Sequence, residues 1–456
     1  MSSRLHAWLA HPVDPAGLAV FRVLFGLLVS LGNLRFLLQG WPQKLYGEPR
    51  FFFRYAGFEW VPPLDGHSAT ACYGAFVVLG VLIAAGFLYR PAMVVFTLLF
   101  AFVQLGDVTN YLNHYWLVLL LSVLLCVLPA TACFAIDNVV FRRSARRIPC
   151  GAVAVLRLQV ACVYVFAAVA KIGVDWLQYG QPLGVWLPSK DELPLIGPLL
   201  SMPLVPLLLS WCGFVYDATI VPLLLWRRTR AFAYVVVLVF HGLTSVFFSI
   251  GMFPVIMAIA TTVFFDPGWP RRLLARASKP SSQRLTTSTT SPWPKAATVA
   301  LVVYAAVQLA LPLRCFVIGD DVLWDEAGMR FSWRVMIREK SGSLSYKVTL
   351  GPLHQHRVIV VSPHERLQWR QVNEMIGQPD LILQLAHAIK NDLDENGYGP
   401  VEIRADSTVT LNGRRSTRLI DPDVDLGAVD DCFFCRPSFI LPPPPTPPPD
   451  PWRRLR

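Results

Sequence analysis

Nine apolar runs dominate this chain, and most of them are long enough for an α-helix to cross a lipid bilayer. A bilayer-spanning helix takes roughly 20 mostly apolar residues, and so many apolar runs cannot be buried in one soluble core. We therefore predict an α-helical polytopic membrane protein with eight or nine transmembrane helices. The lower count applies if the stretch 231–265 is not broken near Gly251 and Pro254. The runs cover about residues 17–38, 69–88, 92–106, 114–133, 150–171, 203–225, 231–248, 252–265 and 296–313.

The basic residues between these runs predict how the chain is oriented in the membrane. The formal net charge is +11, and Lys and Arg are concentrated in alternate connections. Cytoplasmic loops of membrane proteins carry an excess of Lys and Arg, so these connections are predicted to be cytoplasmic. They lie at residue 90 and within 142–147, 227–230 and 271–284. The other connections, and the region after Leu313, are predicted to be non-cytoplasmic. We expect membrane lipid as a partner and no nucleic acid.

The chain divides by composition into a transmembrane domain and a smaller extramembrane domain. The transmembrane domain covers 12–313 and includes a cytoplasmic linker at 278–294 that is rich in Ser, Thr and Pro. Residues 314–430 are predicted to form a non-cytoplasmic α+β domain that is β-rich, with a strand at 331–337 and a hairpin that turns at Asn412 and Gly413. The proline-rich tail, 436–456, is predicted to be disordered.

Cys432 and Cys435 form a C-x-x-C pair near the end of the chain. This pair has no second cysteine pair and no nearby His, so the spacing of a zinc site is missing. The pattern gives little support to a redox role, and a local disulfide remains open for the pair. We predict no metal site in the protein.

Several ionisable residues lie at the depth of the predicted spans, where a charge at a helix centre costs at least roughly 2.5–3.5 kcal/mol. Such a residue needs a partner or a wet cavity. Four of these residues are predicted to form structural charge pairs, with an arginine from one span facing an aspartate from another. They are Arg22, Asp107, Arg157 and Asp217.

Lys171 is the leading catalytic candidate, because it ends an apolar run and is followed closely by Asp175 and Trp176. An apolar wall favours the neutral amine, which is a competent general base, although a lysine at this place can also simply extend to the membrane surface. Asn113 and His114 begin a span on the same predicted face, where an amide and an imidazole can stabilise a developing oxyanion. His241 lies deeper in its span, and packing and pocket lining are both open for it.

The sequence around these residues resembles the vitamin K-dependent gamma-glutamyl carboxylase family, which belongs to the horizontally transferred transmembrane domain superfamily. The likeness runs from about residue 12 to 426. The most specific block contains the run Ser-Ile-Gly-Met-Phe at the break between two spans, followed at the family's distance by Trp-Pro-Arg. The blocks are residues 14–26, 107–114, 154–176, 240–253 with 269–271, 331–333 and 421–425.

The resemblance implies an enzyme that oxygenates a reduced quinone to its epoxide. The strong base so formed removes a γ-proton from a peptide glutamate, which then adds CO2. It implies reduced vitamin K (phylloquinol or menaquinol), O2 and CO2 as cofactors and a Glu-containing peptide or protein as substrate. Lys171 takes the place of the base and Asn113 with His114 that of the Asn-His pair. The residues implied to bind substrate are Asp175, Trp176, His241, Phe248, Ser249 and Met252.

The chain also departs from the family pattern, because Met329 and Arg338 replace a Tyr and a His near the Ser-Trp block. These changes put the docking of a protein substrate in doubt. Two alternatives therefore stand beside the carboxylase. One is a quinol epoxidase without carboxylase activity, and the other is a non-catalytic transporter or accessory protein on the same scaffold.

Overall fold

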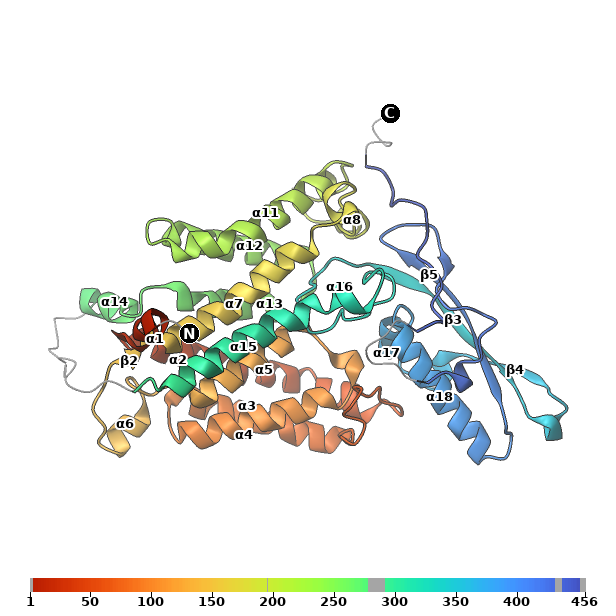
Figure 1. The fold of residues 1–456 in the computed structure, drawn as a ribbon, viewed down its shortest axis with the longest axis horizontal. Helices are drawn as coiled ribbons and strands as arrows, with labels where there is room; N and C mark the ends of the chain where they lie inside the picture. Colours follow the sequence, from red (N-terminus) through yellow and green to blue (C-terminus); the bar gives the residue numbers. More distant parts are fainter. Residues whose placement is uncertain (1–2, 195, 278–291, 431–436, 452–456) are drawn as a thin grey trace.

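The computed structural model describes residues 3–194, 196–277, 292–430 and 437–451. Figure 1 shows a bundle of helices with a smaller domain of strands and helices packed at one end. Residues 278–291 of the predicted linker and residues 452–456 of the predicted tail lie outside the described residues, as do Cys432 and Cys435.

The predicted spans correspond to apolar helices of the bundle, which make this an integral membrane protein. Within the described ranges, six helices are long and apolar enough to cross a membrane, and three shorter apolar helices accompany them. The number of crossings, eight or nine, stays a prediction. The six are α2 (Ala16–Leu38), α3 (Gly66–Ala85), α7 (Cys150–Ala170), α11 (Val205–Leu225), α12 (Arg230–Phe247) and α15 (Lys295–Leu313). The shorter ones are α4 (Tyr89–Leu105), α5 (Asn113–Val127) and α13 (Phe253–Thr261), the last continued by η4 (Thr262–Phe264).

Short helices connect or flank these spans. At the end of the bundle far from the extramembrane domain, two strands of two residues each form a pair. The pair is antiparallel and joins β1 (Pro12–Val13) to β2 (Ile148–Pro149). The short helices are α1 (Ser3–Ala10), α6 (Ile136–Val140), α8 (Val174–Leu177), α9 (Leu183–Trp186), α10 (Gly197–Leu200), α14 (Trp269–Ala277) and α16 (Cys315–Ile318).

Small residues let α2 and α3 pack with their backbones in contact. Gly26 and Ser30 on α2 face Gly80 and Ala84 on α3, so that both helices present two small residues four positions apart. A Cβ at Gly80 would lie 2.6 Å from the backbone nitrogen of Ser30, and one at Gly26 would collide with the backbone of Ala84. Such close approach gives membrane helices the van der Waals contact that replaces the hydrophobic effect between them.

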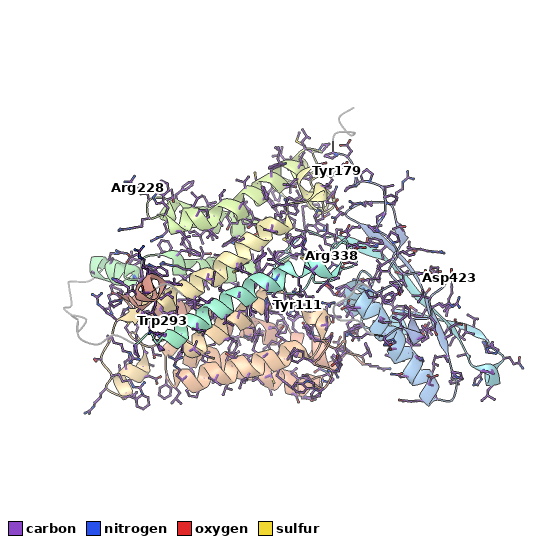
Figure 2. All side chains as sticks on the ribbon, in the orientation of Figure 1. Tyr111, Tyr179, Arg228, Trp293, Arg338 and Asp423 are labelled. Atoms are coloured by element: carbon purple, nitrogen blue, oxygen red, sulfur yellow. The ribbon has the colours of Figure 1, made fainter. Side chains whose placement is uncertain are left out.

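The two ends of the bundle differ in charge. The basic segments within 142–147 and 227–230 and the helix α14 lie at the end away from the extramembrane domain (Figure 1). Figure 2 labels Arg228 at that end and Asp423 on the extramembrane domain at the other. The arrangement agrees with an orientation in which the basic loops face the cytoplasm.

The extramembrane domain is built on a four-stranded antiparallel sheet in the order β4-β3-β5-β6, with helices α17 and α18. Strand β5 alternates regularly between buried and partly exposed residues, as expected for a strand with one face on a core. Its long pairing with β3 runs from Lys340 opposite Leu411 to Thr349 opposite Glu402. The bounds are β3 (Lys340–Thr349), β4 (Val358–Val361), α17 (Trp369–Met375), α18 (Pro379–Glu395), β5 (Glu402–Leu411) and β6 (Thr417–Arg418).

Two expectations for this domain differ from the structure. Residues 331–337 are not a strand but an irregular segment in which Phe331, Trp333 and Met336 have positive φ angles. The described part of the tail, 437–451, is extended but packed against the domain. The indole of Trp324 donates to the Leu441 carbonyl at 2.7 Å, and the guanidinium of Arg414 donates to the Thr446 carbonyl at 3.0 Å.

Candidate functional site

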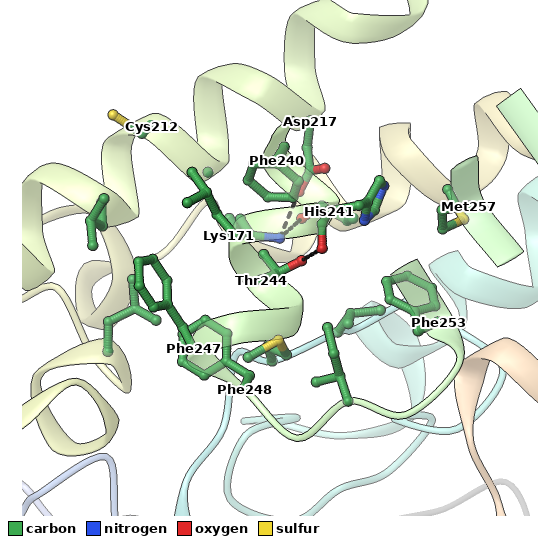
Figure 3. Close-up of a pocket in the computed structure, with 18 of the residues that line it drawn as sticks. Lys171, Cys212, Asp217, Phe240, His241, Thr244, Phe247, Phe248, Phe253 and Met257 are labelled. Carbon is green, nitrogen blue, oxygen red and sulfur yellow. Dashed lines mark hydrogen bonds and ion pairs between the residues drawn. The ribbon is translucent and has the colours of Figure 1, made fainter. Parts of the chain in front are cut away.

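The candidate site is an apolar cavity of about 310 Å³ between α7, α11, α12 and α13, at the end of the bundle nearest the extramembrane domain. Two of its lining residues, Cys212 and Leu243, are also exposed on the outer surface of α11 and α12. The cavity therefore reaches the lipid-facing surface of the bundle. Most of its wall is aliphatic or aromatic, and its polar side chains include Lys171, Asp217 and His241. Figure 3 shows these three near one another, with Phe247 and Phe248 on one side of the cavity and Phe253 on the other.

Lys171 forms a buried ion pair with Asp217. Helix α7 ends just before Lys171, which places its side chain against α11, where the Nζ atom lies 2.7 Å from an Asp217 carboxylate oxygen. The Ala167 carbonyl accepts a second, longer bond at 3.3 Å, and the Trp176 ring centre is 5.1 Å from Nζ. The Trp176 indole donates to the Ser210 carbonyl at 2.7 Å, which holds the ring in place. The lysine is thus screened from water and faces one carboxylate.

His241 lies on the same wall and belongs to a chain of hydroxyl groups. Its Nε2 atom is 3.3 Å from the Tyr164 hydroxyl, which also lies 3.3 Å from the hydroxyls of Tyr216 and Thr261. The His241 Nδ1 atom is buried and has no hydrogen-bond partner among the described residues. Both packing and pocket lining were open for His241, and the structure shows it lining the cavity.

The predicted substrate-binding residues divide between the cavity and its surroundings. Phe248 and Trp176 line the cavity. Ser249 is exposed just beyond α12, and Met252 contacts the Arg35 guanidinium through its sulfur, so neither is among the lining residues.

Asn113 and His114 lie outside the cavity wall that carries Lys171. The Asn113 side-chain oxygen accepts from the Tyr111 hydroxyl at 3.1 Å. The buried His114 ring is 6.2 Å from the ring of Phe253, which lies 6.0 Å from the His241 ring. The Phe253 ring therefore lies between the two histidines, and His114 approaches the cavity from behind this ring.

The Asp175 carboxylate accepts hydrogen bonds from side chains of the extramembrane domain. The Arg414 guanidinium donates to both of its oxygens, at 2.6 and 2.5 Å, and the Asn412 amide donates to one of them at 2.7 Å. The predicted hairpin turn at Asn412 and Gly413 presents these groups, and Asn412 and Gly413 have the positive φ angles that Asn and Gly tolerate well. Asp175 was expected to be a carboxylate near Lys171 and a substrate-binding residue, and in the structure it anchors this turn.

The predicted charge pairs differ from the contacts that the structure shows. Arg22 donates to the backbone carbonyls of Ala84, Ala130 and Phe134, and Arg157 donates to three carbonyls within 263–265. Backbone carbonyls at helix ends and in loops accept most of the hydrogen bonds of these arginines, so neither guanidinium pairs with one of the predicted aspartates. Asp217 pairs with Lys171 rather than with an arginine.

Asp107 is fully buried at the interface between the bundle and the extramembrane domain. Its carboxylate accepts from the backbone nitrogen of Thr109 at 2.9 Å and from the Gln371 amide at 3.3 Å. Burial raises the pKa of the Asp107 carboxyl, although these hydrogen bonds oppose the shift.

Several residues of the site were missed at the level of sequence. Val335 and Met336, in the irregular segment before β3, form part of the cavity wall, and Ile337 beside them packs with Trp176. Tyr164 and Tyr216 were not singled out, although a tyrosine in the middle of a span needs a partner for its hydroxyl. That need is the signal that could have found them. Val335 and Met336 were missed because residues 331–337 were predicted to form a strand.

The fold and the site together define a class of protein: an integral membrane protein with a lipid-accessible cavity, a buried lysine–aspartate pair and an extramembrane domain that completes the cavity wall. Residues 10–269 match the HTTM domain, and residues 293–445 match the vitamin K-dependent gamma-carboxylase lumenal domain. The chain belongs to the HTTM family and, with both matches, to the vitamin K-dependent gamma-carboxylase family. The name of the second domain also supports a non-cytoplasmic position for the C-terminal domain that follows α15. No solved structure matches the chain.

Proposed function

We propose that the protein is a quinol-dependent carboxylase-like enzyme of the membrane, with Lys171 as the base that starts the reaction. The observation that carries this proposal is the Lys171 amine, which faces an apolar cavity that reaches the lipid-exposed surface. A prenylated quinol is delivered by the bilayer, and such a cavity can admit it without passage through water. The reaction would couple oxygenation of a reduced vitamin K to its epoxide with removal of a glutamate γ-proton and addition of CO2.

The cavity wall fits the ring system of a reduced naphthoquinone. Phe240, Phe247, Phe248 and Phe253 offer flat apolar surfaces, and Lys171 and His241 offer polar atoms among them. Aromatic side chains favour stacked and edge-on contacts with other rings, and a few polar atoms in an apolar pocket fix a ligand's orientation. A bound quinol would supply the electrons for the reaction with oxygen. The residues of the chain bind it, orient it and take its proton.

The Lys171–Asp217 pair provides a way to hold that proton. A lysine accepts a proton only as the neutral amine, whereas an ion pair holds it as the ammonium. The 2.7 Å contact allows the proton to shift to the Asp217 carboxylate, and loss of both charges is favoured where water is excluded. The neutral Lys171 amine can then accept the proton of a quinol hydroxyl. Trp176 covers the amine and helps to keep water away from it, whereas the face of its ring, 5.1 Å from Nζ, favours the ammonium.

Asn113 and His114 are proposed to stabilise negative charge that develops during the reaction, on the quinol oxygen or on the glutamate carbanion. Their amide and imidazole groups can donate hydrogen bonds to such a charge. The His114 ring lies behind the Phe253 ring, which lines the cavity, so a movement of Phe253 would open a way from His114 to the ligand.

A direct assay tests the proposal. The purified protein in lipid nanodiscs receives reduced vitamin K, oxygen, labelled bicarbonate and a Glu-containing peptide. We expect quinone epoxide from the wild type and none from Lys171→Ala. Lys190→Ala, which removes a lysine outside the cavity wall in the adjoining loop, is the matched control and should retain the activity. Absence of epoxide from the wild type, or equal amounts from wild type and Lys171→Ala, would refute the proposed function and favour a transporter or accessory protein.

Quinol epoxidation without carboxylation is the second candidate. Arg338, which stands where the family pattern has a His, is held in the structure by an ion pair with Glu326. This ion pair supports a change in the surface that would bind a protein substrate. Neither of its residues lines the cavity. The label from bicarbonate separates the two candidates. An epoxidase without carboxylase activity would form epoxide, but no label would enter the peptide.

A further inference from the structure

A hydrogen-bonded chain runs from the segment that leads into the extramembrane domain to the Asn113 side chain. The backbone N–H of Phe331 donates to the Tyr111 hydroxyl at 2.8 Å, and that hydroxyl donates to the Asn113 side-chain oxygen at 3.1 Å. Phe331 belongs to the irregular segment before β3, 220 residues from Tyr111 in the sequence. The chain therefore links two segments that meet only in the folded protein.

The direction of these hydrogen bonds decides how the Asn113 amide is turned. The Phe331 N–H can only donate, so the Tyr111 oxygen accepts from it and the Tyr111 proton needs another acceptor. Among the described residues, that acceptor is the Asn113 side chain. A flipped amide would set its own N–H groups against the hydroxyl and leave the Tyr111 proton without a partner. The Asn113 oxygen therefore faces Tyr111, and the NH2 group lies on the other side of the amide.

Packing and backbone contacts hold the start of this chain in place. The Tyr111 and Phe331 rings meet edge to face, with their centres 5.0 Å apart. Arg314, which follows α15, donates to the Arg330 carbonyl and to the Ser332 hydroxyl, and so fixes the backbone on both sides of Phe331. Phe331 itself has a φ of 63°, a left-handed conformation that aromatic residues rarely adopt. Burial raises the pKa of the Tyr111 hydroxyl, so it keeps the proton that it donates.

We propose that Tyr111 is a positioning residue, which binds the oxygen end of the Asn113 amide and thereby keeps the N–H end available as a donor. This inference rests on the proposed function, in which Asn113 stabilises a developing negative charge, and adds the residue that orients it. Only the N–H end of an amide can stabilise such a charge, because the carbonyl oxygen would repel it. The Asn113 NH2 group has no hydrogen-bond partner among the described residues. Because the chain begins at Phe331, the orientation also depends on the position of the segment that leads into the extramembrane domain.

Steady-state kinetics of epoxide formation in nanodiscs test the proposal. Tyr111→Phe removes only the hydroxyl, and a single net hydrogen bond is worth about two- to tenfold in an equilibrium. We expect kcat to fall by about two- to tenfold and the KM for the reduced quinone to stay unchanged, because the amide can then turn while the cavity is intact. The matched control is Tyr55→Phe, which removes the hydroxyl from a second tyrosine whose ring lies 6.1 Å from the Phe331 ring. This control should retain the wild-type kcat.

A double-mutant cycle separates positioning from a merely structural role. Asn113→Ala removes the amide, and loss of one donor to an oxyanion lowers kcat by about a hundredfold or more. If Tyr111 acts through Asn113, adding Tyr111→Phe to Asn113→Ala lowers kcat no further, whereas a separate structural role would make the two losses multiply. Asn113→Asp keeps an acceptor for the Tyr111 hydroxyl but offers no N–H donor. It should therefore be about as slow as Asn113→Ala.

Each outcome bears on a different statement. Unchanged kcat in Tyr111→Phe, an equal loss in Tyr55→Phe, or losses that multiply in the double variant overturn the role of Tyr111 and leave the proposed function standing. Wild-type kcat in Asn113→Asp overturns it as well, because the N–H end would then not matter. Wild-type protein that forms no epoxide overturns the proposed function together with this inference. A loss in Tyr111→Phe that vanishes in the Asn113→Ala background supports the role.

Discussion

The contact between Asp175 and the Asn412–Arg414 turn joins the extramembrane domain to the cavity, and its energy can be measured. Three hydrogen bonds to one carboxylate cross this interface, at 2.5, 2.6 and 2.7 Å, and two of them form a bidentate pair with Arg414. We consider Asp175→Asn, which preserves side-chain volume, Arg414→Gln, which replaces the guanidinium by a shorter neutral amide, and the double variant. The next residue, Trp176, covers Lys171, so the anchor acts close to the site.

The geometry predicts a large effect for either single variant. The two side chains are only 11% and 14% exposed, so each charge is largely removed from water. Removing one partner of a buried pair costs about 3–5 kcal/mol, because the other charge remains buried and unpaired. At the edge of the domain we take the lower figure, about 3 kcal/mol, which corresponds to about a hundredfold change in a local opening equilibrium. The double variant leaves neither charge behind, so it should be no worse than a single one.

Hydrogen–deuterium exchange in detergent measures this opening directly. Amide exchange in 174–186 and 405–415 is expected to become about a hundredfold faster in each single variant, with little change in α3 or α4, which are far from the contact. A coupling energy of about 2 kcal/mol is expected from the double-mutant cycle. Strictly additive effects, or unchanged exchange in these segments, would refute the claim that this pair anchors the domain.

Three further predictions concern other parts of the molecule. Replacing Lys171 by Met or Asp217 by Leu should lower the thermal midpoint in detergent more than the double replacement does, because each single change leaves a buried charge unpaired. Gly80→Leu should prevent the close packing of α2 and α3 and leave little folded protein by size-exclusion chromatography, whereas Gly74→Leu, at a glycine of the same helix with open space around it, should be tolerated. The raised pKa of Asp107 means that the folded state takes up its proton more readily than the unfolded state, so the burial penalty is present above the folded pKa and relieved below it. As the pH is lowered from neutral through the folded-state pKa, the thermal midpoint of the wild type should therefore rise relative to that of Asp107→Asn, which does not titrate.

The membrane helices could be predicted from the sequence because their signal is local. A run of apolar residues identifies a span by itself, and the alternation of basic connections identifies its direction. Lys171 was found for the same reason, since a charge at the end of an apolar run is visible without knowledge of any partner. Eight or nine spans were expected, and within the described residues an apolar helix lies at each of the predicted apolar runs, although three of these helices are short.

The partners of these residues could not be predicted, because they are set by packing between segments far apart in the chain. The carboxylate nearest to Lys171 in sequence, Asp175, binds Arg414, which lies 239 residues away. The carboxylate that pairs with Lys171 is Asp217, 46 residues away on another helix. Arg22 and Arg157 donate hydrogen bonds to backbone carbonyls. Such carbonyls are present at helix ends and in loops, and no sequence pattern marks them.

The cavity wall combines both matched regions of the chain, and this has a chemical consequence. The helices supply the Lys171–Asp217 pair, whereas Val335 and Met336 from the segment that leads into the extramembrane domain cover the same cavity. If that cover were lost, water would reach the pair and stabilise both charges, so Lys171 would hold its proton as an ammonium. In a membrane domain that has this lysine but lacks the covering segment, the lysine should therefore be a poor base. The extramembrane domain would then contribute to the chemistry by keeping water out, in addition to any part in binding a protein substrate.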